Sequence, residues 1–529
     1  MISASKASIL EKVEDLFTIT PKNNLNNTSL KILMIGPEVS PYANVGGAAQ
    51  VLGSLAKALF KQGHDVRLFM PKFGFINDTE YPMEMIVSGL EVPTDNTEKP
   101  VLVCNVKTNK LPSRPITYFL ENREYYELRQ NVYGYSDDPI RWALLCRGAL
   151  EFFLKNDEWI PDVIHCNDWQ IGYLPNYLKT KYHNTKLGRI ATVFTIHNLN
   201  YQGMFDHRIL SDLEYDDGRS EIANLFDERL LKQNFMRRGI MYADVVNTVS
   251  ENYAKEIQKP EFGEKLDRLL TEVRAKTSGI LNGIDFEQFN PVTDKLIPIN
   301  YSSSNLAKRI QNKAALQQEF DLVADLAIPL IGFVGRISEQ KGLDLLMQIM
   351  PSLLRDFKVQ FVFVGGVAGG GDSSLASQIK SIQERYPDMV GAHLMLDFDL
   401  SHLVFAGADL IAVPSRFEPC GLVPMEAMRY GAIPLVHGVG GLIDSVKPYD
   451  YSSDSGFGFV FKEYDPYSLF GQIVRALEIY KDIETWTKLQ KIVMSQDNSW
   501  QNRAANYVAL YDRASQVALR RLEHEGKLE

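Results

Sequence analysis

The stretch that decides the fold is PSRFEPCGLVPMEAMRYGAIPLVHGVGGLIDSV, residues 414–446. The apolar run 410–413 comes directly before it and stops at a proline, which is typical of a buried parallel strand. Residues 425–430 predict a short helix that ends at a glycine, and the apolar run 433–436 predicts a second strand. Strand, helix and strand in this order predict an α/β unit with a parallel sheet.

Two acidic residues and a glycine loop in this stretch indicate a binding site. Glu418 and Glu426 lie on either side of the predicted turn from strand to helix. Gly438, Gly440 and Gly441 form a loop that opens another helix, where backbone N–H groups can bind an anion. Because carboxylates accept hydrogen bonds from sugar hydroxyls, the stretch predicts a site that holds a phosphate and a sugar together.

The motifs PSRFEPCGL, RYG and GGLIDSV resemble the C-terminal domain of glycogen and starch synthases. These are retaining glycosyltransferases of the two-domain GT-B fold. The resemblance implies that Glu418 orients the glucose of the donor. It also implies that the donor is bound by Cys420, Gly421, Leu422, Gly440 and Gly441.

Glu426 resembles a wider glycosyltransferase pattern, in which two glutamates are separated by seven residues. In many bacterial glycogen synthases this position is not acidic. The resemblance implies that Glu426 holds the ribose of the donor. The alternative interpretation is a solvated residue on the surface of the helix.

Two cations follow another predicted strand, 329–334, in the sequence GRISEQKGLDLL. Arg336 and Lys341 resemble the family pattern Arg-x-x-x-x-Lys-Gly, which implies that they neutralise the diphosphate of a sugar nucleotide. Arginine binds phosphate bidentately and lysine acts as a point charge, so both suit a leaving diphosphate. The alternative is ordinary surface charge. The sequence shows no metal-ligand cluster, so we expect no metal and no cofactor, with cations in place of a metal ion.

The first half of the chain opens with strand 31–36, a glycine loop and a helix that ends near Gly63. Asn44, Gly46 and Gly47 lie in this loop, which resembles the Lys-x-Gly-Gly-Leu loop of glycogen synthases and implies donor binding. The fit is partial, because Asn44 stands at the lysine position and Ala48 at the leucine position. Asparagine can donate hydrogen bonds but supplies no positive charge. We therefore expect altered donor use, altered acceptor use or weakened catalysis.

Two further candidate residues follow predicted strands in this half. HCNDW resembles the family's His-x-x-Asp-Trp turn and places Asp168 at the carboxyl end of strand 162–166, where open α/β sheets bind ligands. Asp168 could also cap the helix that begins at Trp169. FTIHNLNYQG resembles the active-site strand of the family and implies that His197 hydrogen-bonds the donor sugar. A histidine after a strand can equally be structural.

An aromatic segment precedes the helix near residue 140. The tyrosines could stack on sugar rings, as the resemblance to the family's aromatic segment suggests, or pack on the sheet as loop aromatics. They are Tyr125, Tyr126, Tyr133 and Tyr135.

Composition limits the class of protein. The chain has 529 residues, is 45% hydrophobic and carries a formal net charge of −10, so a nucleic-acid partner is not expected. Its four cysteines show no framework spacing, which favours reduced thiols and a cytoplasmic location. No apolar run is long enough to span a membrane, and residues 1–30 lack the apolar core of a signal peptide.

These patterns predict an α/β protein with two Rossmann-like domains that face an interdomain cleft. We expect an N-terminal extension at 1–30, an acceptor-side domain at 31–295, a nucleotide-sugar domain at 296–495, and a helix at 496–529 that packs back on the first domain. Within residues 1–30, the apolar spacing of Ile9, Val13 and Phe17 predicts a short helix.

The resemblance, which covers residues 31–518, implies transfer of glucose with retention from a nucleotide-glucose to the non-reducing 4-OH of an α-1,4-glucan. It favours ADP-glucose over UDP-glucose. Two alternatives remain open: a related glycosyltransferase with another donor or acceptor, favoured by Glu426 and Asn44, and a non-catalytic glucan-binding or priming partner, favoured by the missing loop lysine. No pattern in the sequence sets the oligomeric state.

Overall fold

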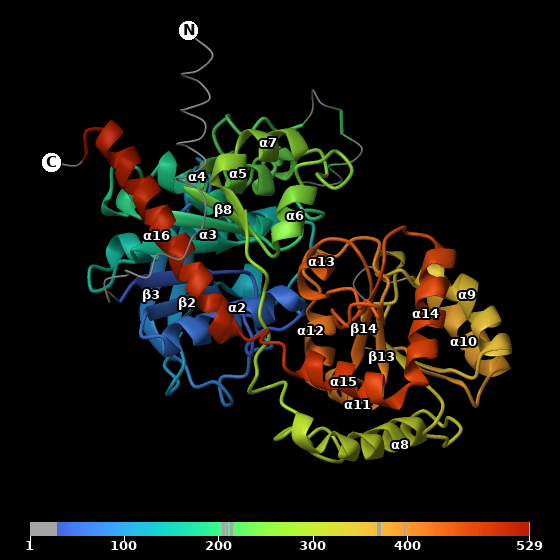
Figure 1. Cartoon of the computed structure of the whole chain (residues 1–529). Coiled ribbons are helices and arrows are strands. Elements are labelled where there is room, and N and C mark those ends of the chain that lie inside the picture. The colour runs from blue at the N-terminus through green and yellow to red at the C-terminus, as the bar shows by residue number, and fades with distance from the viewer. Residues whose placement is uncertain are drawn as a thin grey trace, which may run out of the picture. The chain divides into compact units, whose positions relative to one another are not determined.

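The computed structural model describes residues 29–203, 207, 210–211, 215–367, 372–395 and 397–527. The chain forms two compact units (Figure 1). The first unit contains the residues up to Ile280 and those from Trp500 onward, and the second contains Leu281–Ser499. The short helix predicted within residues 1–30 lies outside the described residues.

The first unit is built on a sheet that is parallel except at one edge. β1 lies centrally and pairs in parallel with both β2 and β6, while β4 pairs antiparallel with β3 on one side and with β5 on the other. In spatial order the strands are β3 (Glu84–Pro93), β4 (Val101–Asn109), β5 (Ile116–Glu121), β2 (Asp65–Pro71), β1 (Lys31–Ile35), β6 (Val163–Asn167), β7 (Ala191–Ile196), β8 (Val245–Thr248) and β9 (Thr277–Gly279). Apolar runs such as KILMI form the central strands because both faces of a parallel sheet are covered.

Helices and short turns connect these strands. α2 (Gly47–Lys61) follows β1 and buries one apolar face, as its periodicity predicts. The other helical segments of this unit are η1 (Arg123–Glu127), α3 (Asp138–Lys155), η2 (Trp169–Ile171), α4 (Tyr173–Lys179), η3 (Lys186–Arg189), η4 (Glu228–Lys232), α5 (Phe235–Tyr242), α6 (Glu251–Glu256), α7 (Asp267–Glu272), η5 (Arg274–Lys276) and α16 (Trp500–His524).

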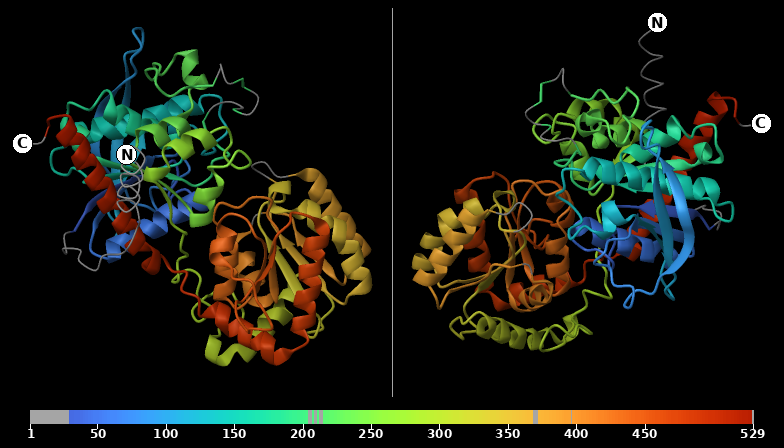
Figure 2. Two further views of the ribbon diagram at one scale, coloured as in Figure 1. Left: turned by 45° about the horizontal axis from the view of Figure 1, so that its top comes forward. Right: turned by 180° about the vertical axis from the view of Figure 1, so that it is seen from behind.

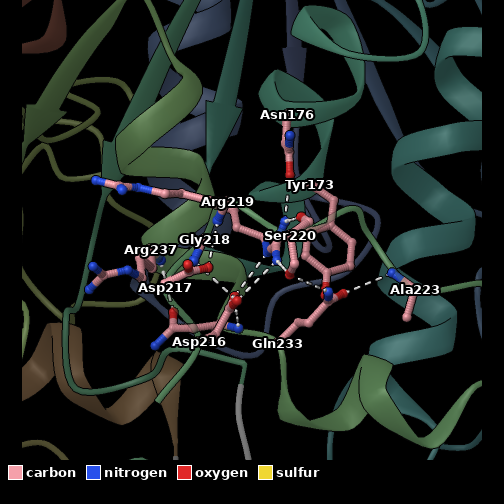
Figure 3. A network of polar contacts seen from close by, with 12 residues as sticks. Tyr173, Asn176, Asp216, Asp217, Gly218, Arg219, Ser220, Ala223, Gln233 and Arg237 are labelled. Atoms are coloured by element: carbon pink, nitrogen blue, oxygen red, sulfur yellow. Dashed lines mark hydrogen bonds and ion pairs between the residues drawn. The ribbon is translucent and has the colours of Figure 1, made fainter. Parts of the chain in front are cut away.

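In the described residues 215–234, which precede α5, buried polar contacts hold much of the chain in place. The buried guanidinium of Arg238 donates to both carboxylate oxygens of Asp216, at 2.9 Å each, and to Oδ1 of Asn176 at 3.0 Å. Gln233 Oε1 accepts hydrogen bonds from the hydroxyl of Tyr173 and the amide of Ala223 (Figure 3). A satisfied buried network of this kind can fix one conformation of a loop.

α16 returns the end of the described chain to the first unit, where it packs against α2 and β7 (red in Figure 1). Its buried face carries Tyr507, Tyr511 and Ala514. The ring of His165 on β6 forms hydrogen bonds with the hydroxyl of Tyr511 at 3.0 Å and with Oγ1 of Thr195 at 2.7 Å. Burial lowers the pKa of His165 to about 3, so this central histidine is neutral at physiological pH.

The second unit contains an entirely parallel sheet with helices on both faces (Figure 2). In spatial order its strands are β12 (Val390–His393), β11 (Gln360–Val364), β10 (Leu330–Val334), β13 (Leu410–Val413), β14 (Ile433–His437) and β15 (Phe459–Phe461). The helical segments are η6 (Ser303–Lys308), α8 (Arg309–Glu319), η7 (Glu339–Lys341), α9 (Leu343–Asp356), α10 (Ser373–Arg385), α11 (Phe398–Gly407), α12 (Leu422–Arg429), α13 (Gly441–Ser445), α14 (Pro466–Tyr480) and α15 (Ile483–Met494).

The chain passes from the first unit to the second after Ile280, earlier than the predicted boundary at 295. Buried polar contacts explain the difference. The carboxylate of Asp294 accepts hydrogen bonds from Nδ1 of His402 at 2.7 Å and from the hydroxyl of Tyr430 at 2.5 Å. These contacts join the segment before residue 295 to α11 and to the end of α12, so it belongs to the second unit.

Among the described residues, no helix combines the length and the apolar character that crossing a membrane requires.

Candidate active site

The order of strands in the second unit creates a switch point between β10 and β13. The chain moves from β10 outward through β11 and β12, and then returns to the other side of β10 for β13, β14 and β15. Open α/β sheets bind ligands at the carboxyl ends of the two strands at such a point. Arg336 and Lys341 follow β10, and Glu418 follows β13, so the topology brings these three predicted residues to one place.

Lys341 and Glu418 form an ion pair at this point. The ammonium Nζ lies 2.6 Å from Oε2 of Glu418, which also accepts a hydrogen bond from Oγ of Ser415 at 3.0 Å. The side chain of Glu418 is 10% exposed, whereas that of Lys341 is 22% exposed. The pair therefore places a partly accessible cation beside a fixed carboxylate, which suits an anion and a hydroxyl group as neighbouring ligands.

A glycine makes this approach of the two loops possible. Gly342 has φ of +76°, and a Cβ atom there would lie 1.9 Å from the carbonyl oxygen of Pro414. Only glycine fits such a close crossing in the left-handed region. Arg336 lies on the same loop, where its guanidinium donates to Oε1 of Gln340 at 3.1 Å.

The turn after β13 leads directly into α12, whose first residue is Leu422 rather than the predicted residue 425. Cys420 is buried, and Gly421 has φ of +82° immediately before the helix. Glu426 lies within α12 and is 8% exposed, so it is not the solvated surface residue of the alternative interpretation. It has no hydrogen-bond or ion-pair partner in the part of the chain that is described, and burial raises its pKa to about 8.

The predicted glycine loop lies between β14 and α13. Gly440 has φ of +51°, and a Cβ atom there would lie 1.9 Å from the carbonyl oxygen of Glu418. The amide of Gly441 donates to that same carbonyl at 3.0 Å. In this structure the two glycines therefore support the backbone of Glu418, and their close packing explains the glycine pair.

In the first unit, the loop between β1 and α2 is held by an acidic residue that the sequence analysis did not single out. Glu38 is 3% exposed, and its Oε2 accepts hydrogen bonds from the amides of Val45 at 2.6 Å and Gly46 at 3.2 Å. Its Oε1 accepts from the hydroxyl of Tyr133 at 2.9 Å. Burial raises the pKa of Glu38. The signal available in the sequence was its place shortly after the first strand.

The rest of this loop is open to solvent and leads into a helix. Asn44 is exposed, and Gly47 begins α2, where first-turn N–H groups have no carbonyl partner within the helix. The amide of Gly46, by contrast, already donates to Glu38.

Asp168 follows β6 and does not cap the next turn, contrary to one of its predicted roles. Its carboxylate makes no capping hydrogen bond to the described residues of η2. Instead, Oδ1 accepts hydrogen bonds from the amides of His197 at 2.8 Å and Asn198 at 3.4 Å, which fixes the loop after β7. Asp168 has φ of +60°, a strained conformation for a non-glycine residue, and burial raises its pKa to about 7.

His197 begins the loop after β7, beside the end of β6. Its ring Nε2 lies 3.0 Å from Oδ1 of Asn167, the last residue of β6. Burial lowers the pKa of His197 to about 4, so the imidazole is neutral at physiological pH.

For two of the four tyrosines, the structure favours packing in the protein over stacking on sugar rings. Tyr125 and Tyr126 are buried, and the hydroxyl of Tyr126 donates to the carbonyl of Arg141 inside the unit. Tyr133 and Tyr135 are half-buried. The first two rings belong to the core because η1 turns them inward.

Comparison with known proteins agrees with this architecture. Residues 31–272 match the starch synthase catalytic domain family, and residues 317–491 match the glycosyl transferases group 1 family. The structure superposes on sucrose-phosphate synthase from Thermosynechococcus elongatus with a TM-score of 0.56 at 20% identity, over 91% of this chain and 98% of that one. The two α/β units and the two family matches define a GT-B glycosyltransferase, and the chain is an enzyme of this class.

Two relatives at higher sequence identity show which family of GT-B glycosyltransferases the chain belongs to. The glycogen synthase of Moorella thermoacetica is 40% identical over 92% of this chain and 97% of its own length. The catalytic domain of starch synthase IV from Arabidopsis thaliana, solved with ADP and acarbose, superposes with a TM-score of 0.81 at 30% identity, over 92% of this chain and all of that one. The chain belongs to the glycogen and starch synthase family.

Proposed function

We propose that this enzyme transfers glucose with retention from ADP-glucose to the non-reducing 4-OH of an α-1,4-glucan. The observation that carries the proposal is the group of Arg336, Lys341 and Glu418 at the switch point of the second unit. The starch synthase IV relative was solved with ADP and acarbose, which supports an adenine nucleotide and a glucan-like acceptor here.

The cations act on the leaving group. When the bond between the sugar C1 and the phosphate oxygen breaks, negative charge grows on the departing diphosphate. Arg336 and Lys341 stabilise that charge in the transition state more than in the ground state, which lowers the barrier. Lys341 is held by Glu418 at 2.6 Å before the donor arrives, so little reorganisation is needed.

The remaining residues bind the sugar and the ribose. Glu418 accepts a hydrogen bond from a glucose hydroxyl, while Cys420, Gly421 and Leu422 line the donor at the start of α12. Glu426 is protonated at neutral pH, so it can donate as well as accept a hydrogen bond with the ribose hydroxyls. In the first unit, His197 contacts the donor sugar and Asp168 holds the backbone of that histidine.

Retention follows if the acceptor attacks on the face from which the diphosphate departs. The acceptor hydroxyl then gives its proton to a departing phosphate oxygen, and no enzyme nucleophile is required. Exclusion of water during this step prevents hydrolysis of the donor.

The test is glucose incorporation into glycogen, with ADP-glucose and UDP-glucose supplied separately and the anomeric configuration of the new bond read by NMR. We expect transfer from ADP-glucose and an α-linkage. Lys341→Ala should lower kcat/KM for the donor about 10²- to 10³-fold, the size of a lost transition-state contact. Lys358→Ala, which removes an exposed lysine of the same unit, is the matched control. Transfer from UDP-glucose alone would overturn the donor assignment. No transfer from either nucleotide by folded protein would favour another donor, the alternative that Asn44 and Glu426 suggest.

A further inference from the structure

Asn167 and His197 meet at the carboxyl ends of β6 and β7. Asn167 pairs with Thr195 in the ladder between these strands, so its side chain stands where the sheet ends and the loops begin. Oδ1 of Asn167 lies 3.0 Å from Nε2 of His197, and Asn167 is 2% exposed.

The orientation of the Asn167 amide is determined by its other contacts. Nδ2 lies 3.2 Å from the carbonyl oxygen of Ile35 and 3.1 Å from that of His165. Carbonyl oxygens can only accept, so both protons of the amide nitrogen are used and the nitrogen cannot face the histidine. Oδ1 therefore faces His197, and an amide oxygen can only accept a hydrogen bond.

This contact specifies which ring nitrogen of His197 carries the proton. A neutral imidazole has one N–H, and here it must be on Nε2 in order to donate to Asn167. Burial keeps the ring neutral at physiological pH. Nδ1 then carries a lone pair, and the described residues offer it no hydrogen bond. The nearby titratable groups are Asp168, which bonds the histidine backbone, and the buried His165.

We propose that Asn167 is a positioning residue that holds His197 in the Nε2–H form, so that Nδ1 accepts a hydrogen bond from a hydroxyl of the donor sugar. The part that concerns the sugar rests on the proposed function. A carboxylate or phosphate at that position of the sugar would face a lone pair instead of a donor. Asn167 and His197 together therefore favour a nucleotide sugar with an uncharged hexose over one that carries a uronic acid.

The first experiment reads the tautomer directly and needs no turnover. Protein labelled with ¹⁵N only in histidine rings is studied by NMR at neutral pH, and the signals of His197 are assigned by their loss in His197→Gln. We expect a protonated Nε2 and an unprotonated Nδ1. A protonated Nδ1, in either the other tautomer or an imidazolium, would overturn the proposal.

Variants then test whether Asn167 is responsible. Asn167→Ala should abolish the pure Nε2–H form. If the alanine variant does not fold, Asn167→Ser is used in its place. A serine hydroxyl can donate as well as accept a hydrogen bond, so it cannot hold His197 in one tautomer. Asn247→Ala is the matched control. It removes another buried amide, on β8 and two strands away from Asn167, that donates to Thr195 and has no hydrogen bond to His197. An unchanged tautomer in both Asn167 variants would refute the role of Asn167.

The second experiment measures selectivity for the sugar. Nucleotide-glucose is compared with its single-deoxy analogues and with nucleotide-glucuronic acid. For one deoxy analogue we expect kcat/KM to fall about tenfold in the wild type, the factor of one neutral hydrogen bond. The ratio of kcat/KM for nucleotide-glucose to kcat/KM for this deoxy analogue should approach one in Asn167→Ala and stay near ten in Asn247→Ala. An equal ratio in all three proteins, or efficient use of the uronic acid, would overturn the inference. If the wild type uses no nucleotide-glucose, the proposed function fails, while the NMR result still decides the tautomer.

Discussion

The substitution Glu426→Gln replaces the buried carboxyl on α12 with a neutral amide of nearly the same size. Burial raises the pKa of Glu426 from 4.5 to about 8, and the group has no partner among the described residues that would stabilise its charge. At neutral pH the carboxyl is therefore protonated in the folded protein and ionised in the unfolded chain. The glutamine variant has no such difference.

The sign and size of the effect follow from proton linkage. Between pH 4.5 and 8 the folded state binds one more proton than the unfolded state, so the free energy of unfolding falls as the pH rises. The contribution is complete below pH 4.5 and is lost as the pH rises toward 8. The slope is about 1.4 kcal/mol per pH unit. Between pH 5 and pH 7, Glu426 should therefore lower the free energy of unfolding of the second unit by about 2.8 kcal/mol. In Glu426→Gln, the free energy of unfolding should not show this decrease with pH.

Hydrogen exchange measured by mass spectrometry in increasing urea gives the free energy of unfolding for the second unit alone, from peptides of β13 and β14. Wild type and variant are compared at pH 5, 6 and 7. Glu463→Gln, which neutralises an exposed carboxyl of the same unit, is the control and should follow the wild type. A difference between Glu426→Gln and wild type that stays constant over these pH values would show that Glu426 is ionised in the folded protein and refute the reasoning.

Other substitutions test different parts of the structure. Asn44→Lys places a cation in the exposed loop before α2 and should lower the KM for the sugar nucleotide several-fold in initial-rate assays; an unchanged KM would exclude that loop from the donor site. Asp294→Ala leaves the buried His402 and Tyr430 groups without their acceptor, so exchange in urea should show the second unit destabilised by about 3 kcal/mol, whereas a loss below 1 kcal/mol would contradict this role. Gly342→Ala forces a Cβ to within 1.9 Å of the Pro414 carbonyl and should lower donor kcat/KM more than tenfold, while exchange in β1 and β6 stays as in wild type.

Much of the second unit could be predicted from local patterns. The apolar runs that became β13 and β14 stop at a proline and before a glycine loop, and both signals reflect backbone requirements that act within a few residues. Polar and apolar residues do not alternate in these runs. Both faces of each strand are therefore expected to be buried, as in a parallel sheet. α12 starts three residues earlier than predicted because Val423 and Pro424 are poor helix formers that hide the start in the sequence, and the left-handed Gly421 supplies the boundary instead.

The contacts between loops could not be predicted in the same way. Lys341 and Glu418 are 77 positions apart, and they meet because β10 and β13 are neighbours, which depends on strand order rather than on any local motif. Glu38 holds the amides of the loop after β1, although nothing in PEVSPY distinguishes it from a surface glutamate. Capping by Asp168 was a reasonable alternative because aspartate is a common N-cap residue, but its carboxylate instead accepts a hydrogen bond from the amide of His197, 29 positions away.

The place of α16 in the sequence has a consequence for how the protein is made. This helix covers β7 and α2 of the first unit, yet the ribosome synthesises it after the whole of the second unit. Leu281–Ser499 is continuous, so all the strands and helices of the second unit are synthesised before α16. The first unit begins to emerge earlier but must wait with an uncovered apolar face until Tyr507 and Tyr511 arrive. Chaperones that bind exposed apolar surface on nascent chains should therefore engage the older half of this polypeptide for longer than the younger one.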